Sequence, residues 1–130
     1  MITLEDIENC LEVQSLIIGA QKQLTAMGYT EHSVRHATIV ANRSGKILEM
    51  LEYDKERIEL AKIAGYLHDI GNNVNRTNHA HTGAILAYDI LKDLGMDLND
   101  RTEIMMAIGN HDEQTRQGSK WHFSSINISR

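Results

Sequence analysis

The sequence predicts an all-α protein of five or six helices, and three observations support that prediction. Apolar residues recur at helical spacing along almost the whole chain, and no segment has the pattern of a convincing strand. The chain contains no proline, although average usage would give about six. This absence is expected of helices that are joined by short turns. The length of 130 residues is typical of one domain.

Two helices are predicted in the first part of the chain. Thr3 and Asp6 have the spacing of a capping box, and the helix that they open is expected to end at Gly28. Thr30 is a candidate N-cap for the second helix, which Gly45 interrupts. The apolar stripes are Val13, Leu16, Ile17, Ala20, Leu24 and Met27 in the first helix, and Val34, Ile39, Val40, Ile47, Leu48 and Leu51 in the second.

A third helix is predicted after Asp54, a candidate N-cap, and it is expected to stop near Gly71. Its apolar residues are Ile58, Ala61, Ile63, Ala64 and Leu67. Residues 72–78 consist mainly of asparagine and other polar residues. They are therefore predicted to form a polar loop.

Two more helices complete the prediction. The first runs from about residue 79 to Leu94, with Gly95 as its stop, and the second begins among Asp97, Asn99 and Asp100. The residues expected to face inward are Ile85, Leu86, Ile90 and Leu91 in the first of these helices, and Ile104, Met105 and Ile108 in the second.

The chain is divided into a helical domain, residues 1–113, and an unpatterned basic C-terminal tail, residues 114–130. The tail holds three basic residues and no acidic one, which leaves residues 1–113 with a net charge of −8. Because helical periodicity is lost there, the tail is expected to be disordered or loosely docked. The same change of character suggests an alternative, that the chain is a truncated or frameshifted product of a longer gene.

Charge and composition exclude several classes of protein. Thirteen Lys and Arg against 18 Asp and Glu give a net charge of −5, which argues against nucleic acid as the main partner. No apolar run approaches the length of a membrane span. The N-terminus lacks the pattern of a signal peptide, and the single cysteine, Cys10, has no internal partner. A cytoplasmic location is therefore expected.

The distribution of histidine points to a metal site. His68 and Asp69 are adjacent at the end of an apolar helix. Adjacent helical residues point about 100° apart, so this pair can converge on one cation only near a helix end. His36, His79 and His111 lie on other predicted helices, as expected of ligands that meet in the core of a bundle. Imidazole with carboxylate suits Mn, Fe, Co, Ni or Zn.

The segment His68-Asp69-Ile70-Gly71 resembles the signature of the HD-domain superfamily of metal-dependent phosphohydrolases, and the resemblance covers roughly residues 28–113. Residues 31–36 resemble the helix that supplies the family's first histidine ligand. Residues 79–84 resemble its His-x-x-x-Gly-Ala element, and residues 107–111 resemble the segment that gives a further histidine.

The resemblance implies a set of site residues. His36, His68 and Asp69 would hold one divalent metal, His79 and His111 would hold a second, and Asp69 would bridge them and serve as the catalytic carboxylate. Counting back from Gly83 selects His79 as the ligand and leaves His81 as its neighbour, with the opposite assignment as the alternative. The remaining two histidines, His32 and His122, are interpreted as incidental.

The sequence departs from the family pattern at three places. No Asp follows Asp112, although members close the site with an Asp from a later helix. Asn72 stands where many members have Lys, with Arg76 as a nearby cation, and Asn110 precedes His111 where a pair of His is common. The site is therefore either incomplete or completed by Asp112, Glu113 or a neighbouring subunit.

The function implied is a metal-dependent phosphohydrolase that acts on a small phosphorylated substrate such as a nucleotide. One alternative is a non-catalytic HD module that binds metal or nucleotide and serves regulation or forms a homodimer. A third interpretation is an α-helical interaction protein with incidental histidines.

Overall fold

Six α-helices and one short 3-10 helix make up the computed structural model, which describes residues 1–29 and 33–111. These residues include no strand, so the predicted all-α class is confirmed. The elements in chain order are α1 Leu4–Glu8, α2 Leu11–Ala26, α3 Ser33–Met50, α4 Lys55–Leu67, η1 Ile70–Asn73, α5 His79–Asp93 and α6 Leu98–Gly109.

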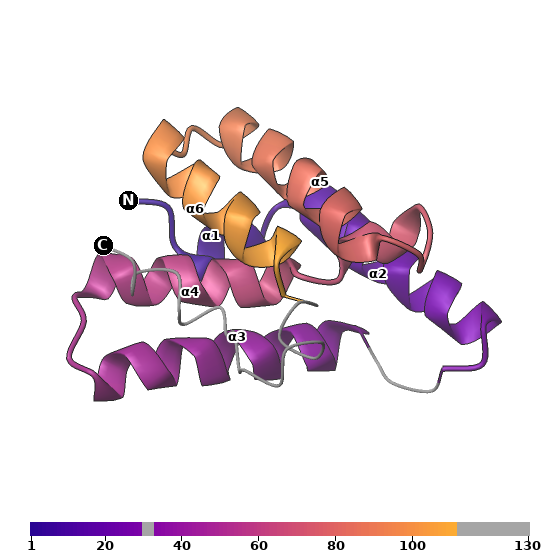
Figure 1. Cartoon of the computed structure of the whole chain (residues 1–130), viewed down its shortest axis with the longest axis horizontal. Helices are drawn as coiled ribbons and strands as arrows, with labels where there is room; N and C mark the ends of the chain where they lie inside the picture. The colour runs from indigo at the N-terminus through magenta and orange to yellow at the C-terminus, as the bar shows by residue number, and fades with distance from the viewer. Residues whose placement is uncertain (30–32, 112–130) are drawn as a thin grey trace.

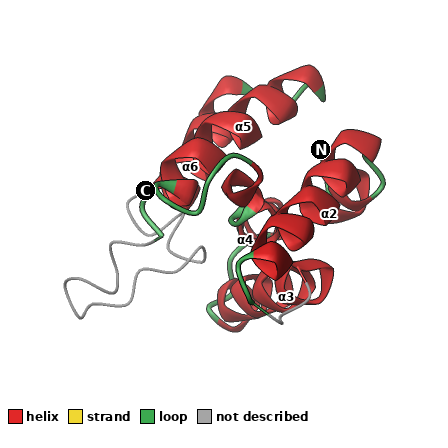
Figure 2. Ribbon diagram, turned by 90° about the vertical axis from the view of Figure 1, so that its right-hand side faces the viewer, coloured by secondary structure: helices red, strands yellow, loops and turns green. Residues whose placement is uncertain are grey.

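The helices form two packed pairs with α4 in the middle. α3 lies along α4, and α5 lies along α6 (Figure 1). α4 also contacts α6 and α1, while η1 packs against both α2 and α5. Figure 2 shows the same arrangement from the side, with α5 and α6 towards the upper left and α2 and α3 towards the lower right. The second half of α4 is buried on all faces because neighbouring helices surround it, which suits its apolar composition.

The predicted caps are confirmed at both kinds of helix end. Thr3 and Asp6 form the capping box of α1, and the Asp54 and Asp97 carboxylates accept hydrogen bonds from the backbone of the first turns of α4 and α6. Gly28 and Gly95 have φ angles of +93° and +89°. This left-handed conformation favours glycine and ends α2 and α5.

The first predicted helix is in fact two helices. The chain leaves helical conformation at Cys10, whose ψ is 120°. The break allows Ile7 on α1 and Val13 on α2 both to be fully buried. The backbone N–H of Leu4 donates to the Glu59 carboxylate on α4, which holds α1 against the core.

The apolar face predicted for α3 is wrong for three of its six residues. Val34, Ile47 and Leu51 are exposed, whereas the buried face carries Ala37, Ala41, Ser44, Gly45 and Leu48. The reason is a close approach of two helices. A Cβ added at Gly65 on α4 would lie 3.1 Å from the Val40 carbonyl oxygen. Small residues are therefore required where α3 meets α4.

α5 shows a similar correction. Ile85, which was expected to face inward, is 69% exposed. The buried positions are mostly small ones, Gly83, Ala84 and Ala87, together with Ile90 and Leu91. Because Gly83 lies against Gly71, this face of α5 has no room for large side chains near its N-terminus.

The loop predicted for residues 72–78 is partly a buried 3-10 turn. Asn72 is 1% exposed, and its amide donates to the Asp69 carbonyl oxygen at 2.9 Å. The Asn73 amide donates to the Leu16 carbonyl oxygen of α2 at 2.6 Å. These polar side chains are buried because they satisfy backbone groups of neighbouring elements.

Two predictions concern residues outside the described part of the chain. They are the Thr30 cap and the division of the chain at residue 113, and both stay predictions.

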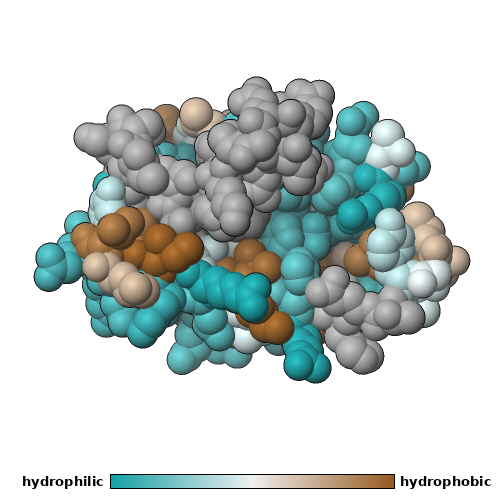
Figure 3. All heavy atoms as spheres, turned by 60° about the horizontal axis from the view of Figure 1, so that its bottom comes forward, coloured by the Kyte–Doolittle hydropathy of each residue, from teal (hydrophilic) through white to brown (hydrophobic). Residues whose placement is uncertain are grey.

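In the described part of the chain, no helix is long and apolar enough to cross a membrane. The face in Figure 3 is mainly hydrophilic, with an apolar area towards the α3–α4 turn. Exposed apolar side chains at that end of α3 are Ile47, Met50 and Leu51.

Candidate metal centre

Five predicted site residues, from four places in the chain sequence, come together in one cluster. His36 lies on α3, His68 caps the C-terminus of α4, Asp69 follows it, His79 is the first residue of α5, and His111 comes just after α6. They form two groups that share the aspartate. One group is His36, His68 and Asp69, and the other is Asp69, His79 and His111.

The end of α4 explains how adjacent residues reach the same point. His68 still has helical angles, but Asp69 has left them, with φ −103° and ψ 5°. The Nε2 atom of His68 and the Oδ2 atom of Asp69 are 3.1 Å apart as a result. The two ligand atoms thus lie close together at a helix end, where the sequence predicts it.

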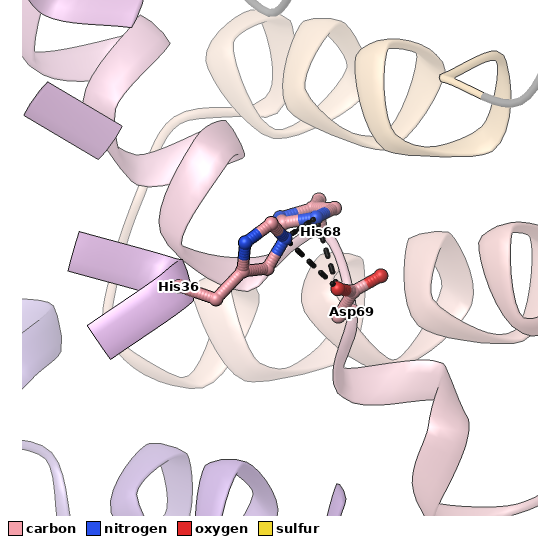
Figure 4. Close-up of side chains that lie close together, drawn as sticks. All are labelled: His36, His68 and Asp69. Atoms are coloured by element: carbon pink, nitrogen blue, oxygen red, sulfur yellow. Dashed lines mark hydrogen bonds and ion pairs between the residues drawn. The ribbon is translucent and has the colours of Figure 1, made fainter. Parts of the chain in front are cut away.

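The first group is a tight triangle of potential ligand atoms (Figure 4). The His36 Nε2 atom lies 3.2 Å from His68 Nε2 and 3.4 Å from Asp69 Oδ2. Metal bonds of about 2.1 Å place neighbouring ligand atoms about 3.0–3.4 Å apart in octahedral or tetrahedral sites. The spacing of the three atoms therefore fits one divalent transition metal ion.

The second group uses the other oxygen of the same carboxylate. The His79 Nε2 atom is 3.4 Å from Asp69 Oδ1. The His111 ring centroid lies 5.3 Å from that of His79 and 5.2 Å from that of His68. Asp69 thus presents one oxygen to each group, which is the arrangement of a carboxylate shared between two cations.

Backbone carbonyl groups fix which ring nitrogen carries the proton in three imidazoles. The Nδ1 atoms of His68, His79 and His111 lie 2.7, 3.1 and 2.6 Å from the carbonyl oxygens of Gly65, Arg76 and Ile108. A carbonyl oxygen only accepts, so each Nδ1 carries the proton. Each Nε2 then presents a lone pair to the cluster, as in metal-ligating histidines.

The carboxylate at the centre of the cluster is held in its charged form. Burial alone would raise the pKa of Asp69, but the side chains of His36, His68 and His79 beside the carboxylate outweigh burial. The pKa of Asp69 is consequently held below its usual range. An ionised carboxylate with neutral imidazoles is the donor set that divalent transition metals prefer.

The cluster has a closed side and an open side. His68, His79 and His111 are 6–7% exposed. The side chains of His36 and Asp69 are 30% and 26% exposed. A ligand from solvent therefore reaches the cluster over His36 and Asp69.

The two neighbouring histidines at the start of α5 differ in position. His79 is buried in the cluster, whereas His81 is exposed on α5. The register counted back from Gly83 thus selects the histidine that lies in the cluster, and its role as a metal ligand stays a prediction. The residues considered for closing it, Asp112 and Glu113, lie outside the described part of the chain, as do His32 and His122.

Sequence reasoning missed the supports behind the cluster. The Asn72 side chain joins the Asp69 carbonyl oxygen to the Arg76 guanidinium, whose Nη1 donates to Asn72 Oδ1 at 3.2 Å. A Cβ at Gly71 would overlap the His79 carbonyl oxygen. From the sequence, Asn72 stands out only because many family members have lysine there, and Gly71 only as a helix stop. The contacts of both residues are made with distant or later elements, which the sequence does not reveal.

Comparisons with known proteins agree with the motif. The family model described as HD domain matches residues 29–121. The uncharacterized protein MJ1020 of Methanocaldococcus jannaschii is 32% identical over 109 residues, an alignment that covers 67% of this chain and 42% of that protein. The chain thus spans less than half the length of this curated relative. No solved structure is significantly similar to the chain.

The match covers most of the chain and includes every residue of the cluster. Together with the His68-Asp69 signature and the all-α architecture, it identifies the chain as a member of the HD-domain superfamily of metal-dependent phosphohydrolases.

Proposed function

We propose that this chain is a metal-dependent phosphohydrolase that acts on a small phosphorylated substrate such as a nucleotide. The observation that carries the proposal is the shared carboxylate of Asp69, whose two oxygens face two sets of histidine nitrogens. Membership of the HD-domain superfamily supports the same reaction class.

The residues divide into two ligand sets in this proposal. His36, His68 and Asp69 would hold one divalent ion, and Asp69, His79 and His111 would hold the other. Mn, Fe, Co, Ni and Zn are the candidates. Bound divalent ions of this kind polarise a phosphoryl oxygen and lower the pKa of water.

The chain's own residues supply orientation and charge. The carbonyl-bonded imidazoles of His68, His79 and His111 keep their Nε2 atoms aimed at the cluster. The Asp69 carboxylate stays ionised because the neighbouring imidazoles hold its pKa below the usual range. Burial of three imidazoles keeps water from the inner side, so the substrate binds on the side of His36 and Asp69.

The charge balance favours a small substrate. The net charge of −5 argues against a nucleic acid backbone as the main partner. A single phosphate group can instead be attracted by cations at the cluster itself.

The proposal is tested by phosphate release. The protein is freed of metal, supplied separately with Mn²⁺, Co²⁺, Ni²⁺, Fe²⁺ or Zn²⁺, and incubated with nucleotides and simple phosphate esters. We expect release with at least one ion, and none from an Asp69→Ala variant. Stoichiometric metal binding without hydrolysis of any substrate would instead favour the alternative, a regulatory module. Asp69 is chosen for substitution because it is the one carboxylate that the described residues contribute to the two groups.

A further inference from the structure

One buried hydroxyl next to the metal centre has no partner among the described residues. Ser33, the first residue of α3, is 9% exposed, and its Oγ atom makes no hydrogen bond. Leaving a buried hydroxyl unsatisfied costs free energy, so such a group calls for an explanation. Ser44 on the same helix is also buried, but its Oγ donates to the Val40 carbonyl oxygen at 2.8 Å.

The position of Ser33 connects it to the first ligand group. It lies one helical turn before His36, on the same side of α3. Ser33, His36, His68 and Asp69 line one small cavity, whose other walls include Ile17 and other apolar side chains. Figure 4 shows His36 reaching from α3 towards His68 and Asp69. Ser33 and Asp69 therefore line the same small cavity.

The start of α3 is fixed from outside the helix. The Ser33 backbone N–H donates to the side-chain oxygen of Gln21 on α2. This hydrogen bond satisfies the Ser33 backbone donor and fixes the position of the Ser33 backbone beside the cluster. The hydroxyl is consequently restricted to the few χ1 rotamers that this position allows.

The cavity limits what the hydroxyl can bind. The centre of a water molecule can move within about 10 Å³ of this cavity. This is roughly the space that a single water molecule requires. The four aliphatic residues in the walls offer no hydrogen bond, and the other lining residues are Ser33, Tyr66 and members of the cluster. The space therefore suits one oxygen atom, which accepts a hydrogen bond from Ser33.

We propose that Ser33 is a substrate-binding residue, whose hydroxyl donates a hydrogen bond to an oxygen of the phosphate group bound at the metal centre. A water molecule takes that position when phosphate is absent. This inference rests on the proposed function. Many family members have lysine at the position of Asn72, whose side chain here is hydrogen-bonded to Asp69 and Arg76. Ser33 would therefore supply a neutral hydrogen-bond donor on the α3 side of the site.

The test measures binding of inorganic phosphate to the Mn²⁺-loaded protein by calorimetry, in the parent and in Ser33→Ala. We expect the dissociation constant for phosphate to rise about tenfold, the effect of one hydrogen bond to a charged group. Binding of Mn²⁺ should be unchanged. Ser44→Ala is the matched control, and it should bind phosphate like the parent.

A second readout is thermal stability without metal or phosphate. Ser33→Ala should melt no lower than the parent because it removes a hydroxyl that has no protein partner. Ser44→Ala should melt lower because it removes a hydrogen bond. A lower melting temperature for Ser33→Ala would assign the hydroxyl a structural role and overturn the inference.

The outcomes separate the two proposals. If the parent binds Mn²⁺ and Ser33→Ala binds phosphate with the parent's affinity, the hydroxyl holds water alone and the inference is overturned, while the proposed function stands. If Ser33→Ala loses Mn²⁺, the hydroxyl serves the metal and the inference is likewise overturned. If the parent takes up none of the five candidate ions, both proposals fail.

Discussion

At the scale of single residues, the cluster depends on where each imidazole nitrogen points. Three histidines donate their Nδ1 protons to carbonyl oxygens three residues earlier in the chain. Each of these contacts lies at a helix end, where the carbonyl group or the histidine is free of the regular helical bonding. The same local motif therefore prepares His68, His79 and His111 as ligands.

The two histidines at the start of α5 allow a direct test of the assigned metal ligands. His79→Ala should remove the second of two metal ions and leave the first, because His79 belongs only to the group with His111. His81→Ala should change metal content and affinity by no more than about twofold, as an exposed substitution does. Elemental analysis and metal titration of both variants measure this.

The opposite ranking, with greater loss of metal in His81→Ala, would mean that α5 has a different register at the site. The sequence motif already favours His79 because the spacing to Gly83 can be counted along the chain. Ser33 and Asn72 could not be predicted in the same way. Their roles depend on which side chains of other elements lie beside them, and no local pattern reveals that.

At the scale of elements, the position of α5 depends on a close contact with η1. Gly71 lies under the first turn of α5, and any Cβ there would overlap the His79 carbonyl oxygen and crowd the Gly83 N–H. This contact brings the start of α5, and with it His79, next to Asp69. Glycine at position 71 thus serves the packing of two elements as well as the end of a helix.

Gly71→Ala should therefore displace the first turn of α5. We expect the free energy of unfolding to fall by about 1–3 kcal/mol, as for an overpacked core, and binding of the second metal ion to weaken. Gly109→Ala is the control, since its Cβ would meet the Ala84 Cβ at an ordinary 3.6 Å. Urea denaturation and metal titration of the two variants check the prediction, and equal effects would contradict it.

Local sequence patterns predict the ends of the helices better than their buried faces. The caps at Thr3, Asp54 and Asp97 were predictable because a cap involves residues close in the chain. The buried faces of α3 and α5 were predicted less well. Their partners approach so closely that alanine, glycine and serine occupy the contact, and a search for large apolar residues selects exposed ones such as Val34 and Ile85.

At the scale of the whole molecule, acidic side chains gather between α4 and α6. Asp100 lies 3.6 Å from the Arg57 guanidinium, which lowers its pKa. Burial, the hydrogen bond with Asp97 and the charges of Asp97 and Glu56 outweigh this effect, and they raise the pKa of Asp100 to about 6. The folded protein therefore binds a proton at Asp100 more strongly than the unfolded chain does.

This shift makes stability depend on pH in a defined direction. Stability from Asp100 is complete below the unfolded-state pKa of 3.8 and is lost as pH rises through about 6. Asp100→Asn should therefore stabilise the protein at pH 7.5, by on the order of 1 kcal/mol after allowing for solvent screening. The gain should shrink towards pH 4.5. Urea denaturation at both pH values measures it, and a gain that is larger at the lower pH would contradict the assignment.

The candidate metal centre brings five residues from four parts of the chain together around Asp69. The most direct test is the metal content per chain, by elemental analysis of protein purified without chelator or added metal, beside Asp69→Ala. The variant should keep its helical circular dichroism, because Asn72 bonds the Asp69 backbone and not its side chain. We predict one or two transition metal ions in the parent and none in the variant. Equal metal content in the two proteins, or none in the parent, would contradict the account.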